Sequence, residues 1–270
     1  MIQQSERRSM RRVGCSKFFR QLNARYLLAP SITLWRTAEA ELLRGLIFQP
    51  PVLDLCCGDG YFASLIFPDC LDAGCDISSQ AVNAARNRGF YEEVAQADIT
   101  QSIPWPTDHF QTIMSNSSLE HVADINAALR EVSRVLLPGG VLVATFASNY
   151  AYDWWPCGPE AMEKYLRYQP VHNRFSLDEW GTRMAAVGLI PVKHRYYFSR
   201  AATKFAMWLD YHFSRAYLTN DPCLAYLVVR QLLPRVPPKI LKAFWWTTLS
   251  WVSLEEVDPG GGILILARKE

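Results

Sequence analysis

Glycines and carboxylates stand next to short apolar runs in the first half of the 270-residue chain. Residues 52–55 form a short, mostly apolar run that includes Asp54, and the run leads through Cys56 into Gly58 and Gly60. This pattern predicts a buried strand that turns tightly into a helix at residues 61–66. Glycine permits such a turn, and it lets a ligand approach the backbone where a Cβ would intrude. A strand, glycine turn and helix of this kind form the first unit of a nucleotide-binding sheet.

Further polar residues follow apolar runs in the same manner. Asp76 ends a run about twenty residues after the glycines, and Asp98 and Asn116 end the next two. A carboxylate at the end of a second strand can accept hydrogen bonds from both hydroxyls of a ribose. Because open α/β sheets bind ligands at the carboxyl ends of their strands, we expect these side chains to surround one ligand.

Predicted strands alternate with predicted helices along much of the chain. Strands are expected at residues 52–55, 71–76, 94–98, 111–115, 141–146, 190–198 and 262–268. Helices are expected at residues 34–46, 61–66, 80–88 and 124–136, with Asp124 as an N-cap and a capping box at Ser176 opening one more. This alternation predicts an α/β protein with a parallel sheet.

The motifs, in this order and spacing, resemble those of class I S-adenosylmethionine-dependent methyltransferases. They occupy residues 52–62, 73–78, 97–99, 113–122 and 135–146, so the resemblance covers roughly residues 50–147. The series is similar to methyltransferase type 11 and to the quinone-pathway methyltransferases of the small-molecule branch. The resemblance implies a Rossmann-like, doubly wound, seven-stranded and mostly parallel sheet. It also implies S-adenosylmethionine as cofactor and a small acceptor, which we expect to be apolar or aromatic.

The resemblance assigns the first motif to the methionine end of the cofactor. The backbone of Gly58 and Gly60 would hold that end, and Asp54 would support the turn. Many family members have glycine where this chain has Cys56. The backbone carbonyl of Cys56 can still make the family's contact, so we retain it among the cofactor-binding residues.

The later motifs would hold the nucleoside. By the resemblance, Asp76 takes the ribose hydroxyls and Ile77 packs on the adenine. Asp98 accepts from the adenine amino group, and the Ile99 amide meets a ring nitrogen. Asn116 and its neighbours would line the floor near the sulfonium.

Catalytic residues are less well defined by the sequence. Methyl transfer from a sulfonium is an in-line displacement, so it needs alignment and a dry cavity rather than a nucleophilic side chain. A hydroxyl acceptor would benefit from a base with a pKa near neutrality. His121 follows the fourth strand, and His172 lies in an aromatic-rich segment, residues 148–174, that we expect to form a substrate lid. Tyr152 of the same segment could orient the acceptor by hydrogen bonding.

Three parts are expected in the chain. Residues 1–48 form a basic leader and a helical cap, and residues 49–198 with 259–270 form the methyltransferase core. Residues 199–258 form an apolar helical insert before the last strand, rich in tryptophan and flanked by cations. Four roles stay open for this insert: a substrate lid, a small core of its own, a peripheral membrane contact, or a homodimer surface.

Composition excludes several classes of protein. The net charge of +2 does not indicate a nucleic-acid binder, and the seven cysteines form neither a C-x-x-C pair nor a zinc-spaced cluster, so no metal is expected. No signal peptide or membrane-spanning run is evident, which favours a cytoplasmic protein, with peripheral membrane contact left open.

Two alternative functions remain at this stage. The basic leader keeps an RNA or other macromolecule methyltransferase open, although residues 115–118 lack the Asn/Asp-Pro-Pro-aromatic run of base-methylating enzymes. A non-catalytic, cofactor-binding partner subunit is the other alternative, and the intact glycines and Asp76 disfavour it.

Overall fold

A computed structural model describes residues 12–214 and 227–270. Arg7, Arg8 and Arg11 of the basic leader, and residues 215–226 of the expected insert, lie outside the described residues. No helix in the part that the structure describes is long and apolar enough to cross a membrane.

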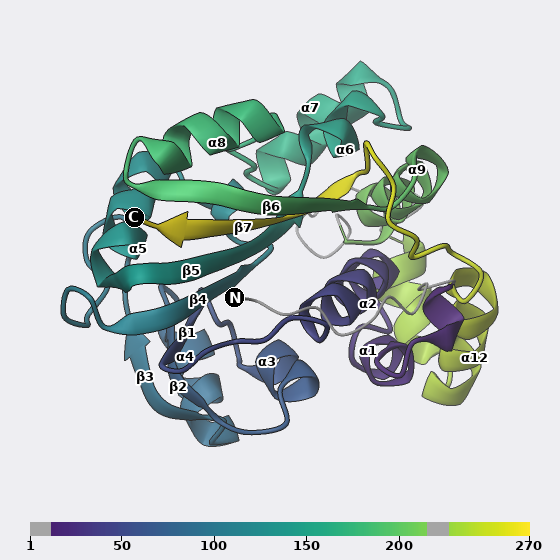
Figure 1. The fold of residues 1–270 in the computed structure, drawn as a ribbon. Helices are drawn as coiled ribbons and strands as arrows, with labels where there is room; N and C mark the ends of the chain where they lie inside the picture. Colours follow the sequence, from purple (N-terminus) through teal and green to yellow (C-terminus); the bar gives the residue numbers. More distant parts are fainter. Residues whose placement is uncertain (1–11, 215–226) are drawn as a thin grey trace.

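The centre of the molecule is one seven-stranded sheet with the order β3-β2-β1-β4-β5-β7-β6 (Figure 1). The strands are β1 Val52–Leu55, β2 Leu71–Asp76, β3 Tyr91–Gln96, β4 Phe110–Asn116, β5 Leu136–Ala147, β6 Leu189–Tyr197 and β7 Gly262–Lys269. Strands β1 to β5 pair in parallel, whereas β7 runs antiparallel to both β5 and β6. The predicted mostly parallel, Rossmann-like sheet is therefore confirmed.

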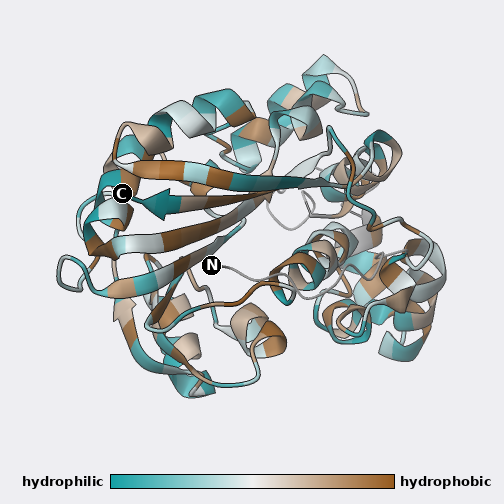
Figure 2. Ribbon diagram, viewed as in Figure 1, coloured by the Kyte–Doolittle hydropathy of each residue, from teal (hydrophilic) through white to brown (hydrophobic). Residues whose placement is uncertain are grey.

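Helices cover both faces of the sheet, as its alternating side chains require. Leu53 and Leu142 face one cluster with α5 Ile125–Val135 and α8 Leu177–Ala185, and Val52 and Val143 face another with α3 Tyr61–Ile66 and α4 Ser79–Arg88. Hydrophobic residues run along much of the central strands (Figure 2). These strands are buried on both faces, which explains why they read as largely apolar runs in the sequence.

Two predicted helix starts have the expected caps. The Asp124 side chain accepts from the Ala127 N–H at 2.9 Å, ahead of α5. Ser176 and Glu179 form the complete capping box of α8. Such caps satisfy backbone N–H groups that have no partner within the helix.

The remaining helices gather beyond the carboxyl end of the sheet (Figure 1). They are α1 Phe19–Arg25, α2 Pro30–Leu43, α6 Asn149–Asp153, α7 Pro159–Tyr168, α9 Arg200–Leu209 and α12 Pro238–Leu249. Short 3-10 and π-helical turns join them: η1 Val13–Cys15, η2 Leu119–His121, η3 Asp210–Ser214, η4 Leu227–Leu232 and η5 Leu233–Arg235. Helices α2, α9 and α12 share one hydrophobic cluster, so the N-terminal helices and the insert pack together.

Some element bounds differ from the prediction. Helix α2 begins at Pro30 rather than at residue 34, because proline suits the first helical turn. Strand β3 begins at Tyr91 and ends at Gln96, so Asp98 lies in the loop after it. Half of this edge strand is exposed, and it therefore lacks the apolar run that marks the buried strands.

Candidate active site

The turn after β1 has the shape expected of a cofactor cradle. Cys56, Gly58 and Gly60 all have positive φ, the region that favours glycine. A Cβ on Gly60 would lie 2.7 Å from the ring of Tyr91, whereas a Cβ on Gly58 would meet nothing within 4 Å. The turn is therefore packed from below and open above, where a ligand can reach its backbone.

Asp76 joins this turn to the end of β2. Its Oδ2 accepts from the Gly58 N–H at 2.9 Å, and its Oδ1 accepts from the Ser78 N–H at 2.9 Å. A carboxylate has about four lone-pair sites, so these bonds leave capacity for ligand hydroxyls. The next side chain, Ile77, is 64% exposed and presents an apolar surface at the same edge.

Asp54 lies beneath the turn rather than on its open side. It is buried, and its Oδ2 accepts a hydrogen bond of 2.7 Å from the Tyr91 hydroxyl. Burial raises the pKa of Asp54 to about 7, although the Tyr91 hydrogen bond opposes this shift. This placement agrees with a supporting role for Asp54.

The loop after β3 lies beside Asp76. The Ala97 N–H donates to the Asp76 backbone carbonyl at 3.0 Å. Asp98 Oδ1 accepts from the backbone N–H and the hydroxyl of Thr100, and the Ile99 side chain is buried in the core. Asp76, Ile77 and Asp98 are thus brought to neighbouring loops.

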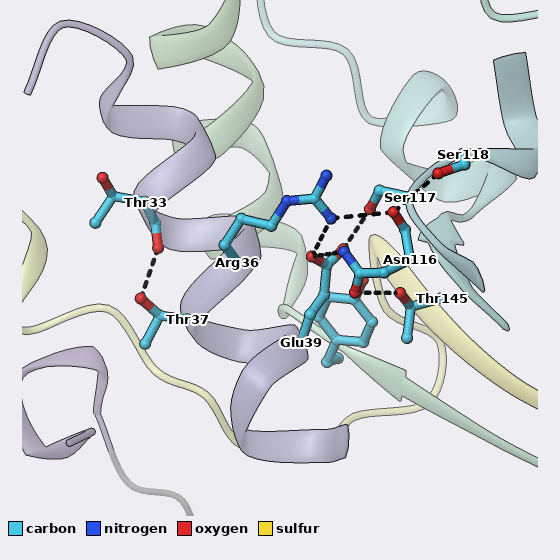
Figure 3. Close-up of polar contacts among 9 residues, drawn as sticks. Thr33, Arg36, Thr37, Glu39, Asn116, Ser117, Ser118 and Thr145 are labelled. Atoms are coloured by element: carbon cyan, nitrogen blue, oxygen red, sulfur yellow. Dashed lines mark hydrogen bonds and ion pairs between the residues drawn. The ribbon is translucent and has the colours of Figure 1, made fainter. Parts of the chain in front are cut away.

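A buried polar network fixes the end of β4 to helix α2 (Figure 3). Its centre is Glu39, which is fully buried and accepts from Asn116 Nδ2 at 3.1 Å and from the Ser117 hydroxyl. Arg36 Nη1 donates to Glu39 Oε2 at 2.9 Å and to the Asn116 carbonyl at 3.2 Å. The Tyr197 hydroxyl donates to Glu39 Oε1 at 3.2 Å.

Both polar atoms of the Asn116 side chain form hydrogen bonds within the protein. Besides its bond to Glu39, Asn116 Oδ1 accepts from the Thr145 hydroxyl at 2.9 Å. Burial raises the pKa of Glu39, while Arg36 and the hydroxyl donors oppose the shift. Glu39 was not among the predicted site residues, although a glutamate inside an apolar helical stripe could have indicated it.

A cavity of about 160 Å³ adjoins this network. It is lined from α2, the loop after β4, the end of β5, the aromatic segment and the insert: Ile32, Trp35, Arg36, Ser117, Glu120, His121, Ala147, Tyr152, Tyr165, Gln169, Met207 and Asp210. Two of the predicted catalytic residues, His121 and Tyr152, are therefore brought together here. The His172 side chain is exposed and does not line the cavity.

The predicted catalytic residues differ in how they are held. His121 Nδ1 lies 2.8 Å from the Pro170 carbonyl, and only the backbone of His172 contacts the site, through its N–H and the Glu120 carbonyl at 2.9 Å. Burial raises the pKa of Tyr152, and the charge of Glu120 adds to this rise.

Glu120 is a cavity residue that the sequence analysis did not select. It is 3% exposed, and its Oε2 has no hydrogen-bond partner among the residues that the structure describes. Burial raises its pKa to about 8, against the lowering effect of neighbouring backbone N–H groups and Arg36. Its position directly before His121 was the available signal. The described residues contain no group of His, Cys, Asp or Glu that could hold a metal ion.

The sheet order, the antiparallel β7 and the glycine turn after β1 define the class I methyltransferase fold. Residues 53–144 match the family model described as a methyltransferase domain. Residues 53–144 therefore match a methyltransferase domain, and the sheet around them has the fold of class I S-adenosylmethionine-dependent methyltransferases.

Relatives of known name agree with this class. Demethylmenaquinone methyltransferase of Listeria monocytogenes is 29% identical over 155 residues, covering 52% of this chain and 62% of that protein. The 27-O-demethylrifamycin SV methyltransferase of Amycolatopsis mediterranei is 28% identical, covering 52% and 54%. The match thus spans less than two thirds of these relatives.

A solved structure shares the fold over nearly the whole chain. It is an S-adenosylmethionine-dependent methyltransferase of Thermotoga maritima, described as a possible histamine N-methyltransferase. The TM-score is 0.59 at 18% identity, covering 94% of this chain and 98% of the other. Identity at this level supports the fold alone.

Proposed function

We propose that this protein transfers a methyl group from S-adenosylmethionine to a small apolar or aromatic acceptor. The observation that carries the proposal is the cavity beside Glu120, which adjoins the strand edge where the glycine turn lies. Ser117 and Ala147 line it from the ends of β4 and β5, and Trp35, Tyr152 and Tyr165 give it aromatic walls. A cavity of about 160 Å³ favours a small molecule over a macromolecule.

The residues around the turn fit the cofactor. Open space above Gly58 leaves room for the methionine end, and Asp76 and Ile77 offer a carboxylate and an apolar surface to the nucleoside. Arg36, held in place by Glu39, supplies positive charge for the methionine carboxylate. When bound, the cofactor supplies an electrophilic methyl group on a sulfonium, which leaves as a neutral thioether. The chain's own task is to align the acceptor and exclude water.

The acceptor class rests on two supports. The curated relatives are named for demethylmenaquinone and for a demethylrifamycin, which are both small molecules. The cavity adds aromatic walls, which suit an apolar or aromatic body. We infer an acceptor whose aromatic body partitions into organic solvent, because Trp35, Tyr152 and Tyr165 supply ring surface while Arg36 and Asp210 are already paired within the protein.

A methyl-label transfer assay tests this function. The protein and labelled S-adenosylmethionine are added to a fractionated extract of the source organism, and organic-soluble and aqueous products are separated. Label should appear in an organic-soluble small molecule. Transfer to RNA or protein, or to a highly charged aqueous product, would overturn the acceptor class. Cofactor binding without transfer to any fraction would favour a non-catalytic subunit.

The outer face of α12 supports a peripheral contact with an anionic membrane. Ile240 and Phe244 are 60% and 53% exposed, and their spacing of four residues places them on one face of α12. Trp251, just beyond the end of the helix, is 55% exposed and lies against Phe205. Lys239 and Lys242 are exposed on the same helix, which contains no acidic residue. Apolar side chains flanked by cations match the chemistry of an anionic lipid surface.

A further inference from the structure

Glu120 is placed between the cofactor turn and the acceptor cavity. It belongs to η2, in the segment that follows β4, and it is one of the residues that line the cavity. The charge of Glu120 also acts on the Cys56 thiol of the glycine turn, where it contributes to the raised pKa of that cysteine. Its carboxylate is therefore electrostatically linked to both halves of the proposed site.

The cavity carboxylate without a complete set of partners is Glu120. Asp210 accepts from the Ser31 hydroxyl at 2.7 Å and from the Tyr165 hydroxyl at 2.6 Å. Glu39, just behind the cavity, accepts from Asn116, Ser117, Arg36 and Tyr197. Glu120 Oε2, in contrast, has no donor among the described residues. Leaving a buried acceptor unpaired is costly, so an oxygen held in this state on a residue of the cavity wall is suited to a ligand's donor group.

The residues around Glu120 indicate that the ligand group donating to Oε2 is uncharged. Arg36, a cation of the cavity wall, is paired with Glu39 and is assigned above to the methionine carboxylate, so an anionic acceptor would meet the negative charge of Glu120 without a cation of its own. Tyr152, Tyr165 and Tyr197 also feel the charge of Glu120, and each has a raised pKa, which keeps these phenols neutral. An ammonium group would have no free lone pair for methylation. An aromatic hydroxyl has both the donor and a nucleophilic atom.

We propose that Glu120 receives the hydroxyl of an aromatic acceptor on Oε2 and takes its proton. The inference rests on the proposed function. The O–H bond of the acceptor breaks, its proton passes to the ionised carboxylate to give the neutral acid, and the electron pair stays on the acceptor oxygen. That oxygen is then the nucleophile for the methyl group. Burial favours the neutral acid and raises the pKa of Glu120 to about 8, so the ionised carboxylate that accepts the proton becomes populated as pH rises through about 8.

Binding of matched ring compounds tests the hydroxyl contact. Calorimetry with saturating S-adenosylhomocysteine compares 1-naphthol with naphthalene in the wild type and in Glu120→Leu. The wild type should bind 1-naphthol about tenfold or more tightly than naphthalene, and Glu120→Leu should reduce this preference to about twofold. Equal wild-type binding of the two rings, no binding of either, or a full preference in the variant would overturn the proposal. Tighter binding of cationic 1-naphthylmethylamine would do so as well.

A conservative variant keeps the test informative if Glu120→Leu does not fold. Glu120→Gln preserves shape and one acceptor oxygen but removes the base. It should bind S-adenosylhomocysteine as the wild type does, yet transfer label to 1-naphthol about a hundredfold more slowly. Glu163→Gln, the same change on the exposed surface of α7, should leave the rate unchanged.

Failure of the proposed proton transfer and failure of the proposed function would give different results. A Glu120→Gln rate close to that of the wild type, or wild-type protein that binds 1-naphthol without methylating it, would overturn the proton transfer. Wild-type protein that fails to bind S-adenosylhomocysteine would instead contradict the proposed function itself.

Discussion

Asp76 carries the proposed cofactor site at the scale of single residues. Asp76→Ala removes the carboxylate that would accept the ribose hydroxyls and that also holds the Gly58 N–H. Loss of hydrogen bonds to a charged acceptor costs about 1.5–3 kcal/mol, so cofactor affinity should fall about tenfold or more. Calorimetric titration with S-adenosylhomocysteine measures this. Asp69→Ala, an exposed aspartate before β2, serves as control. Unchanged affinity in a folded Asp76→Ala protein would remove Asp76 from the site.

Asp54 should make stability depend on pH. Its folded pKa of about 7 lies above its ordinary value of 3.8. Between these values the folded protein holds a proton that the unfolded chain has released, so stability is greatest at low pH and falls as pH rises through about 7. The raised pKa values of Glu39 and Glu120 also make stability fall as pH rises. Urea unfolding measures this dependence. Between about pH 5 and about pH 8, the free energy of unfolding should fall less for Asp54→Asn than for the wild type. An equal fall in both would contradict the buried ionisation of Asp54.

The sequence predicted positions that follow from local chain geometry. Gly58 and Gly60 lie in the predicted turn and Asp76 ends β2, because turns and strand ends have fixed positions relative to apolar runs, whereas the cofactor roles of these residues stay predictions. Glu39 and Glu120 were missed because local pattern assigns carboxylates to the surface. The burial of Glu39 depends on partners from β4 and β6, and Glu120 lies in a cavity lined from α2, the aromatic segment and the insert, so both depend on segments that the sequence separates widely.

The same limit appears at the scale of elements. The strands were predicted well, since burial on both faces leaves a continuous apolar run. The association of α1 and α2 with α9 and α12 was not predicted, because helices from opposite ends of the chain meet only in the folded structure. The amphipathic patterns indicated apolar faces but not their partners.

Trp245 tests this helical association. It is 2% exposed, lies 5.2 Å from Phe213 between ring centroids, and donates through Nε1 to the Leu27 carbonyl at 2.8 Å. Trp245→Ala should therefore lower the free energy of unfolding by about 3–5 kcal/mol. The adjacent Phe244 is mostly exposed, so Phe244→Ala should change it by about 0.5 kcal/mol or less. Urea denaturation measures the free energy of unfolding of both variants. Similar losses in the two would show that α12 is not anchored through Trp245.

The aromatic segment makes a separate prediction. Tyr152 lines the cavity, whereas the His172 side chain is exposed outside it. Tyr152→Ala should weaken 1-naphthol binding by about tenfold, because it removes an aromatic wall. His172→Ala should leave that binding unchanged, and both variants should retain S-adenosylhomocysteine affinity. Calorimetry measures both ligands, and a silent Tyr152→Ala would contradict the assignment of the cavity as the acceptor site.

At the scale of the whole molecule, charge and exposed apolar surface are distributed unevenly. The net charge is only +2, yet α12 combines lysines and exposed apolar side chains without an acid. The proposed membrane contact therefore depends on a local surface rather than on overall charge. If the acceptor is lipophilic, such a contact would also bring the cavity close to where it is dissolved.

Liposome flotation tests that contact. The protein should float with vesicles that contain anionic phosphatidylserine at low salt, less at high salt, and hardly with neutral vesicles, because salt screens the lysine attraction. Lys239→Gln with Lys242→Gln removes about 2 kcal/mol of attraction, roughly thirtyfold in binding. Ile240→Ser with Phe244→Ser should abolish flotation, whereas Val192→Ser, an exposed apolar residue on β6, should not. Equal flotation with anionic and neutral vesicles would exclude the membrane contact. So would sedimentation that shows, without lipid, a dimer formed through these apolar residues of α12.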